Sequence, residues 1–382
     1  MRTLAGAAGI VLLAVILWDG FETIILPRRV TRYFRLTRLF YRYTWMPWAA
    51  LARRVRPGNR RETFLSYFGP LSLLSLFAVW AVGLIVGFGL LHWAAGSAID
   101  VSRGGRPSFF TDIYLSGTTF FTLGIGDVTP RTTLARVITV GEAGMGFGVL
   151  AIVIAYLPVM YAAFSQREVN ISLMDARAGS PPSAVELLRR HGHPDQEAAL
   201  ATYLSEWETW SAQLMESHLS YPVLCFFRSQ HSNQSWLASL STMLDCSAFL
   251  MAYSEGRLCW QAQLTFAMAR HAVVDLSQVL FTPPERPPDD RLPEAALIEL
   301  RAAVTAAGMP LRGDPARERL RELRSRYESY LNGLSRRLLM PLSPWILARQ
   351  SSDNWQTSAW RQPVTLLDGF QVRDDGERQE HK

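Results

Sequence analysis

The sequence predicts an all-α membrane protein with a helical cytosolic domain, and three observations lead to this fold class. Only 19% of the 382 residues are charged, whereas about 25% are charged in soluble domains. Three apolar segments reach the length of about 20 residues that a helix needs to cross a bilayer. The second half shows apolar residues at helical spacing and almost no strand-like alternation. The three cysteines have no paired spacing, so no disulfide framework and no CxxC-type zinc site is expected. No cofactor is predicted either.

The first apolar segment, Leu4–Leu26, is the predicted N-terminal transmembrane helix, in a domain of residues 1–26. We expect an uncleaved anchor instead of a secretory signal, because no small-x-small cleavage site ends the segment. Its two charges, Asp19 and Glu22, lie three residues apart on one helical face. We expect them to pair with Arg28 or Arg29.

Residues 27–70 are a separate, arginine-rich segment with eleven arginines and a single acid, Glu62. The positive-inside rule makes this segment cytoplasmic, which puts the N-terminus outside and everything after the third apolar segment inside. Arginines recur every three or four residues beside aromatic side chains, a pattern typical of a helix in the headgroup layer. Two interpretations remain open: binding of anionic lipids through Arg28 to Arg61, and a topology anchor with interfacial packing. Nucleic-acid binding is not expected.

A predicted pore domain, residues 71–164, contains the other two spanning helices, Leu71–Trp93 and Leu134–Phe164. Between them, Ile113–Gly126 is apolar but only fourteen residues long, too short to span and therefore expected to be re-entrant. We expect residues 109–121 to form a short helix that leads into this segment. The partially negative C-terminal end of such a helix favours a cation within the membrane.

The re-entrant segment ends in Thr122-Leu123-Gly124-Ile125-Gly126-Asp127. Glycine reaches backbone conformations that are closed to other residues, so successive carbonyl groups can point to one side. Four such strands around an axis can replace the water shell of a dehydrated cation with rings of oxygen atoms.

With a spanning helix on each side and a short helix before it, this hexapeptide resembles the T-x-G-x-G-D selectivity filter of the tetrameric potassium channels. The resemblance covers residues 71–164 and implies that potassium ions are the permeant species. It also implies that the Thr122 hydroxyl and the carbonyl groups of Thr122, Leu123, Gly124 and Ile125 line the ion sites, with Asp127 at the outer mouth.

Two positions depart from the family pattern: Leu123 replaces the commoner valine, and Ile125 replaces an aromatic residue that braces the filter. Some two-pore-type potassium channels carry an aliphatic residue at the second position. Tyr114 is expected to supply bracing through a hydrogen bond to Asp127.

Further residues are expected to support the filter from the pore helix and from the third spanning helix. Glu142 is costly in a membrane and must face protein or water. We expect it to lie behind the filter, hydrogen-bonded near Thr118 or Thr119; the alternative is a pair with Arg136.

The third spanning helix is predicted to line the pore. Gly146, twenty residues after Gly126, matches the gating hinge of the family, and Gly144 lies beside it. Small-residue packing against the pore helix is an equally open interpretation. Pro158 is expected to kink the helix, and the residues expected to face the cavity are Phe147, Leu150 and Ile154.

The remaining half is predicted to hold a cytosolic helical domain, residues 165–282, followed by a proline-rich linker and a C-terminal helical tail, residues 283–382. Three groups of polar residues fall on apolar faces: Glu216 with His218, Asp245 beside Cys246, and His271 with Asp275. A ligand, metal or proton-sensing site and ordinary core or surface residues both remain open for these groups.

Because the chain has one filter sequence and no internal repeat of it, four copies must assemble to close a pore. The predicted function is passive potassium conduction by a homotetramer across a bacterial inner membrane, without enzymatic turnover. Two alternatives are a weakly selective cation channel and a membrane-anchored helical sensor with a vestigial pore. The gating stimulus and any cytosolic ligand are not predicted.

Overall fold

The computed structural model describes residues 1–26, 35–101, 107–231, 233–287, 289–313, 315–347 and 353–356. The chain forms two compact units, Met1–Ala162 and Ala163–Lys382, whose boundary falls inside the long helix α6 (Thr133–Ala178). The described part is almost entirely helical, apart from one short two-stranded sheet in unit 1. This architecture confirms the predicted all-α class.

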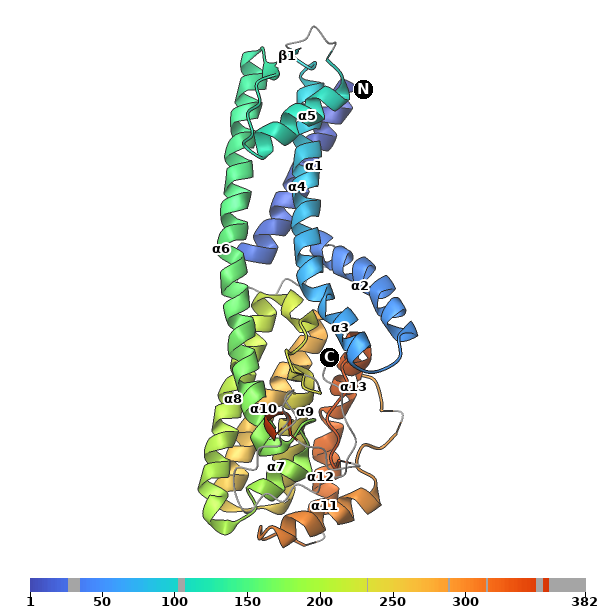
Figure 1. Cartoon of the computed structure of the whole chain (residues 1–382), viewed down its shortest axis with the longest axis vertical. Helices are drawn as coiled ribbons and strands as arrows, with labels where there is room; N and C mark the ends of the chain where they lie inside the picture. Colours follow the sequence, from blue (N-terminus) through green and yellow to red (C-terminus); the bar gives the residue numbers. More distant parts are fainter. Residues whose placement is uncertain are drawn as a thin grey trace. The chain divides into compact units, whose positions relative to one another are not determined.

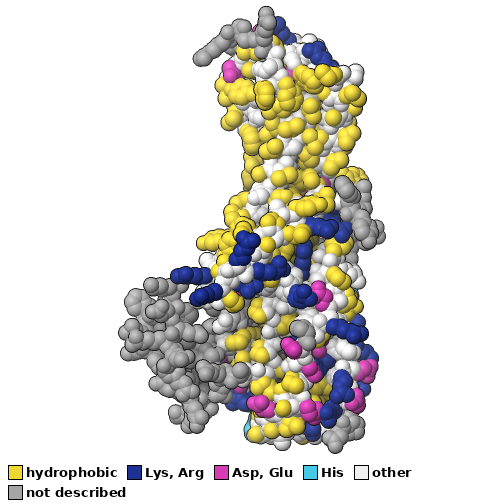
Figure 2. Space-filling model, turned by 90° about the vertical axis from the view of Figure 1, so that its right-hand side faces the viewer, with side chains coloured by type: hydrophobic (Ala, Val, Ile, Leu, Met, Phe, Trp, Pro, Cys, Tyr) yellow, Lys and Arg dark blue, Asp and Glu magenta, His cyan; other side chains and the backbone are white. Residues whose placement is uncertain are grey.

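Three helical segments of the described chain are long and apolar enough to cross a membrane, as predicted. The first joins α1 (Arg2–Gly20) to a π-helical turn, η1 (Phe21–Ile25). The second joins α3 (Asn59–Ser66) to α4 (Phe68–Ala94), and the third is α6. Hydrophobic side chains predominate over the upper part of the view in Figure 2. A membrane location follows from these helices.

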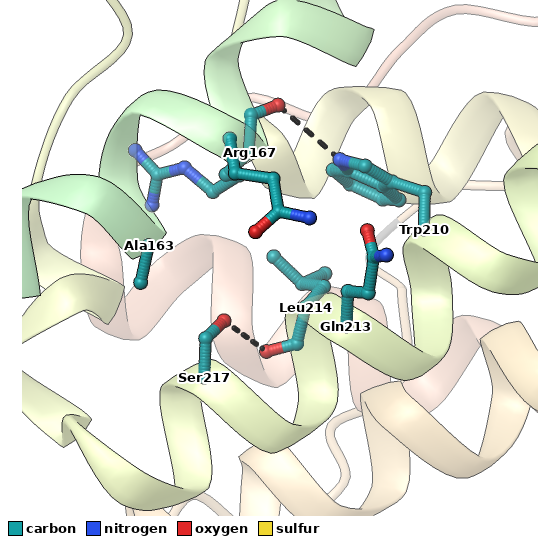
Figure 3. Close-up of a pocket in the computed structure, with 7 residues that line it drawn as sticks. Ala163, Arg167, Trp210, Gln213, Leu214 and Ser217 are labelled. Atoms are coloured by element: carbon teal, nitrogen blue, oxygen red, sulfur yellow. Dashed lines mark hydrogen bonds between the residues drawn. The ribbon is translucent and has the colours of Figure 1, made fainter. Parts of the chain in front are cut away.

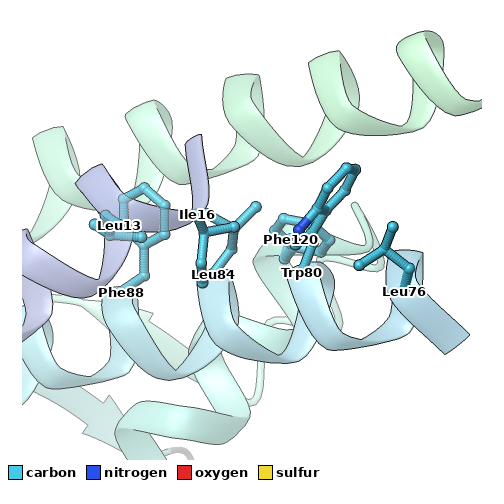
Figure 4. Close-up of a cluster of buried hydrophobic side chains, with 7 residues drawn as sticks. All are labelled: Leu13, Ile16, Leu76, Trp80, Leu84, Phe88 and Phe120. Carbon is cyan, nitrogen blue, oxygen red and sulfur yellow. The ribbon is translucent and has the colours of Figure 1, made fainter. Parts of the chain in front are cut away.

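Unit 1 is organised around α4. The N-terminal helix α1 packs along it, and the short helix α5 (Phe109–Phe120) packs against its C-terminal part (Figure 1). The backbones of α1 and α4 approach closely, since a Cβ atom on Gly9 would lie 2.8 Å from the carbonyl oxygen of Gly87. Such contacts between small residues are common in membrane helices. A cluster of seven buried side chains from α1, α4 and α5 fills the core of this unit (Figure 4): Leu13, Ile16, Leu76, Trp80, Leu84, Phe88 and Phe120.

The C-terminal end of α1 is tied to helix α2 (Leu36–Arg54) by a buried carboxylate, Asp19. Asp19 accepts hydrogen bonds from the backbone N–H of Thr37, at 3.1 Å, and from the indole N–H of Trp80, at 3.0 Å. Thr37 lies in the first turn of α2, where backbone N–H groups have no partner within the helix. Asp19 therefore caps α2 from a distant part of the sequence.

The neighbouring carboxylate, Glu22, accepts a hydrogen bond from Trp18 at 2.8 Å and lies 3.5 Å from the Nε atom of Arg35. The expected partners Arg28 and Arg29 lie outside the described residues.

Unit 2 is a helical bundle that includes the C-terminal part of α6. Helix α9 (Trp236–Tyr253) is buried along nearly its whole length and lies at the centre. Around it pack α7 (Ala184–Arg190), α8 (Glu197–Ser220) and α10 (Gly256–Val279). Short 3₁₀ turns, η2 (Pro194–Gln196), η3 (Pro222–Phe226) and η4 (Asn354–Gln356), complete this part of the unit.

The C-terminal helices belong to the same bundle, which corrects the predicted linker and separate tail. These helices are α11 (Glu294–Ala306), α12 (Pro315–Ser325) and α13 (Glu328–Leu338). The fully buried carboxylate of Asp245 on α9 accepts hydrogen bonds from Tyr327, at 2.7 Å, and from Arg291, at 2.6 Å. A buried charge needs such partners, and here they come from the segment that was expected to be separate.

Candidate ion-conduction site

Helix α5 leads into the candidate filter and begins with a strong local signal. The Ser108 side chain accepts a hydrogen bond from the backbone of Thr111, and the Thr111 side chain accepts one from the backbone of Ser108. This reciprocal capping box fixes the start of the helix. The helix ends at Phe120, close to the expected end, and the chain then continues without regular structure until residue 127.

The sign of the backbone φ angle alternates from residue to residue along the filter segment. Thr122, Gly124 and Gly126 have positive φ angles of 56°, 55° and 81°, whereas Leu123 and Ile125 do not. In a β-strand, successive carbonyl groups point to opposite sides; a left-handed residue at every second position turns them toward the same side. Thr122 reaches this conformation without being glycine, at a cost of roughly 1–2 kcal/mol. Strain of this kind is concentrated at functional sites.

The start of the filter segment is fixed to the C-terminal end of α5. The backbone N–H of Leu123 donates to the carbonyl of Thr118 at 2.8 Å, and that of Thr122 donates to the carbonyl of Thr119 at 2.9 Å. Thr118 and Thr119 thus contact the segment through their carbonyl groups, which have no helical partner at a helix end. All residues from 121 to 127 are exposed in the single chain.

The C-terminal end of the segment is held by a feature that sequence analysis missed. Strand β1 (Ile99–Val101) pairs antiparallel with β2 (Val128–Pro130), with Val101 opposite Val128. Ile99 and Val128 form a small buried cluster with Leu115 of α5. Strands of three residues are too short to show an alternating pattern, so the sequence carried no usable signal.

The expected bond between Tyr114 and Asp127 is present. The Tyr114 hydroxyl donates to Oδ2 of Asp127 at 3.0 Å and links α5 to the residue after the last filter glycine.

Glu142 on α6 is fully buried, but its predicted partners were wrong. Its carboxylate accepts a hydrogen bond from Ser116 of α5, not from Thr118 or Thr119, and lies 3.7 Å from Nε2 of His92 on α4. Arg136, the alternative partner, instead donates to the carbonyl of Pro130, at 3.4 Å. The Thr118 hydroxyl bonds the carbonyl of Leu115 within its own helix, which leaves Ser116 as the hydroxyl turned toward Glu142.

This polar contact brings α4, α5 and α6 together, because the Ser116 hydroxyl oxygen also lies 2.7 Å from the carbonyl oxygen of Ile85 on α4, and the two acceptors share its single proton. Sequence analysis missed His92 and Ser116. One sequence signal could have identified them as partners of Glu142, because each is a polar residue within or at the end of an apolar segment.

The two glycines considered for a hinge differ in their surroundings. A Cβ atom on Gly146 would lie 2.1 Å from the carbonyl oxygen of Phe120 at the end of α5, whereas one on Gly144 would meet nothing within 4 Å. Gly146 is therefore a packing residue beneath the filter, and a hinge role for either glycine stays a prediction. Pro158 lies within α6, which continues past it.

The predicted cavity residues are exposed in the single chain: Phe147 by 66%, Leu150 by 55% and Ile154 by 62%. Their role stays a prediction.

The polar groups of unit 2 have separate partners. His218 is fully buried with Nε2 at 3.1 Å from the Arg167 guanidinium; burial, together with this charge, lowers its pKa well below the usual range. His271 is exposed, and its Nε2 atom lies 3.2 Å from Asp275. Among the described residues no group of three His, Cys, Asp or Glu side chains is arranged to hold a metal ion.

Comparisons with known proteins agree with the geometry of unit 1. Residues 79–162 match a family model described as an ion channel, so an ion channel domain occupies this part of the chain, about a fifth of its length. The uncharacterized membrane protein YdjJ of Bacillus subtilis is 22% identical over 238 residues, which are 62% of this chain and 69% of that protein. No solved structure matches the chain.

Proposed function

We propose that the chain, whose residues 79–162 are an ion channel domain, is one subunit of a homotetrameric channel that conducts potassium passively. The observation that carries the proposal is the alternating backbone at Thr122, Gly124 and Gly126, on a segment fixed between a pore helix and a strand. Carbonyl groups turned to one side can form rings around an ion once four exposed segments meet. No chemical turnover is involved.

The other site residues have supporting roles in this proposal. Asp127 lies at the outer mouth, and the cavity below the filter is lined by Phe147, Leu150 and Ile154. Ser116 and Glu142 hold the pore helix against α6, so they stabilise the filter from behind. The arginine-rich segment faces the cytoplasm of a bacterial cell, which puts the N-terminus outside and unit 2 inside.

A second function, weakly selective cation conduction, is favoured by Ile125. This side chain is 59% exposed in the single chain and offers no hydroxyl or aromatic edge to brace the filter. The Tyr114–Asp127 hydrogen bond is the bracing contact that remains on this side. The two functions differ in the ratio of potassium to sodium permeability.

Flux into liposomes tests the proposal. Purified protein reconstituted under a potassium gradient should carry potassium, and reversal potentials in mixed potassium and sodium should separate strong from weak selectivity. Gly124→Ala should abolish flux with assembly intact, because alanine is strained at a φ of 55° although its Cβ has space. Gly141→Ala, on α6 with open space around its added Cβ and no assigned role, is the matched control. Absence of flux under all pH values, voltages and lipid compositions would support a sensor with a vestigial pore.

Anionic lipids are the proposed partners of the arginine-rich segment. Helix α2 buries Trp45 against Phe68, with ring centroids 4.7 Å apart, and exposes Tyr43, Met46 and Leu51 on its other side. Exposed arginines lie on α2 and shortly after its end: Arg42, Arg53, Arg54, Arg56 and Arg60. An apolar face flanked by cations suits a membrane surface with anionic headgroups.

Vesicle composition tests the lipid proposal. Flux should be higher in vesicles that contain phosphatidylglycerol than in pure phosphatidylcholine, and Arg53→Gln with Arg54→Gln should reduce the difference. Equal flux in both vesicles would leave α2 as a topology anchor only.

A further inference from the structure

Three titratable side chains are buried where α4, α5 and α6 meet. His92 near the end of α4, Asp112 in the first turn of α5 and Glu142 on α6 are exposed by only 1%, 0% and 0%. Two carboxylates and one imidazole are therefore buried in the part of the chain that is proposed to conduct ions. Ionisable residues at such positions are costly, and a functional role is the first hypothesis for them.

Both carboxylates face the imidazole of His92. Oε2 of Glu142 lies 3.7 Å from Nε2 of His92. Asp112 is within electrostatic range of His92 and of the exposed Arg2 on α1. Ser97 connects the two residues, since its hydroxyl donates to Oδ2 of Asp112 at 2.6 Å and its backbone N–H donates to the carbonyl of His92 at 3.0 Å. The charged groups around His92 thus come from α1, α5 and α6.

Four atoms of this cluster have no hydrogen-bond partner among the described residues. They are both ring nitrogens of His92, Oδ1 of Asp112 and Oε2 of Glu142. Buried polar atoms are normally hydrogen-bonded, because a missing bond leaves their desolvation uncompensated. Both ring nitrogens are donors when the imidazole is protonated. One added proton therefore supplies positive charge and donors to two carboxylate oxygens that lack both.

The cluster is connected to the filter segment through α5. Asp112 and Ser116 are four residues apart and therefore lie on the same face of this helix. Ser116 donates to the Glu142 carboxylate. Two residues later, the carbonyl of Thr118 accepts from the backbone N–H of Leu123 at 2.8 Å. A change of charge next to Glu142 thus acts on the helix that holds the start of the filter segment.

The other buried histidine of the described chain has the opposite surroundings. Nε2 of His218 lies 3.1 Å from the Arg167 guanidinium, and its Nδ1 lies 2.8 Å from the carbonyl of Leu214. Figure 3 shows Arg167 and Leu214 at a cavity of about 30 Å³ between α6 and α8, which no carboxylate of the described residues lines. A proton on His218 adds a second positive charge beside Arg167, whereas a proton on His92 adds a positive charge beside two carboxylates. Acid therefore acts on these two histidines with opposite sign.

We infer that His92 is a proton-binding, positioning residue for the filter. With a proton on its ring, it is the counter-charge of Asp112 and Glu142 and holds α5 against α4 and α6. Without this proton, the buried Glu142 carboxylate loses its counter-charge, which destabilises the contact. Histidine normally changes charge between about pH 5 and pH 8, so conduction should rise as the pH falls through this range. The inference rests on the proposed function and adds a proton-binding site to it.

The pH dependence of potassium flux tests this role, because His92 is the one histidine in residues 1–162. Wild-type flux in liposomes should be at least about fivefold higher at about pH 6 than at about pH 8. His92→Gln removes the titrating group, and its flux should differ by less than about twofold between these conditions. Acid effects on unit 2 are common to both proteins and cancel in the comparison. His271→Gln, which alters an exposed ring 3.2 Å from Asp275, is the matched control and should keep the wild-type ratio.

Two further variants keep the test decisive if His92→Gln fails to fold, which tryptophan fluorescence detects. Glu142→Gln and Asp112→Asn each remove one carboxylate, and both should reduce the wild-type ratio. The reduction should be larger for Glu142→Gln, because this carboxylate lies next to the ring. A wild-type ratio in folded His92→Gln, or in folded Glu142→Gln, overturns the inference.

Infrared difference spectra separate this inference from the proposed function. Spectra of the wild type at about pH 6 and about pH 8 should contain the protonation of one more imidazole than spectra of His92→Gln. Flux without this spectral difference overturns the inference and leaves the channel proposal standing. The spectral difference in a protein that carries no potassium supports the proton-binding site and overturns the channel proposal.

Discussion

Replacing Gly146 by alanine should abolish conduction through the filter, although Gly146 does not contact the filter residues directly. The added methyl carbon would lie 2.1, 2.9 and 3.0 Å from the oxygen, carbonyl carbon and Cα of Phe120, whereas ordinary contacts begin at 3.4 Å. These atoms are backbone, so no side-chain rotation relieves the clash. The end of α5 must move by about 1 Å, and the filter begins two residues later.

The magnitude follows from a comparison with Gly144→Ala. In both variants alanine is a better helix former than glycine by about 1 kcal/mol. Because this gain is common to both, the difference in their stability isolates the cost of overpacking, about 1–3 kcal/mol. We expect Gly144→Ala to be neutral or stabilising, and Gly146→Ala to be less stable by this amount.

Thermal unfolding of the purified protein and potassium flux in liposomes measure the two effects. Gly146→Ala should unfold at a lower temperature than Gly144→Ala and should lose most of its flux. The opposite ranking of the two variants would refute the packing argument. A loss of flux in Gly144→Ala with unchanged stability would instead indicate a hinge.

Three further outcomes are expected. Ser116→Ala leaves the buried Glu142 carboxylate without its hydroxyl donor, so the protein should lose about 1–3 kcal/mol of stability in denaturant titrations; Glu142→Gln should lose less, because a neutral amide tolerates burial better. Tyr114→Phe removes the bond to Asp127, so currents in planar bilayers should decay faster and potassium selectivity should fall; unaltered currents would exclude a bracing role. The lowered pKa of His218 keeps it neutral when folded, so the unfolded state binds more protons as the pH falls below about 6.5. Unit 2 should therefore lose stability below that pH, and His218→Gln should lose less when followed by tryptophan fluorescence.

Features that depend on local sequence could be predicted. Long apolar runs identified the three spanning segments, because the bilayer sets one required length. The apolar run too short to span and the glycine spacing located α5 and the filter segment, and the bond between Tyr114 and Asp127 was also predicted.

Features that depend on distant partners were missed. Glu142 was expected to form a hydrogen bond with a threonine. The spacing of residues does not show which side of α5 contacts α6, and that side carries Ser116. The proline-rich stretch looked like a boundary because proline breaks helices. Arg291, at the end of that stretch, instead reaches the buried Asp245, a contact 46 residues apart in sequence.

The cap that Asp19 provides for α2 sets a constraint on biogenesis. One of its donors is the first turn of α2, and the other is Trp80 of α4, 61 residues later in the chain. A carboxylate within a newly inserted helix is costly until its partners arrive, by about 2.5–3.5 kcal/mol at the centre of the membrane. The first transmembrane helix is therefore fully stable only after the second has entered the bilayer. The time needed to synthesise the arginine-rich segment therefore sets the delay between insertion of α1 and the arrival of Trp80, its second hydrogen-bond donor.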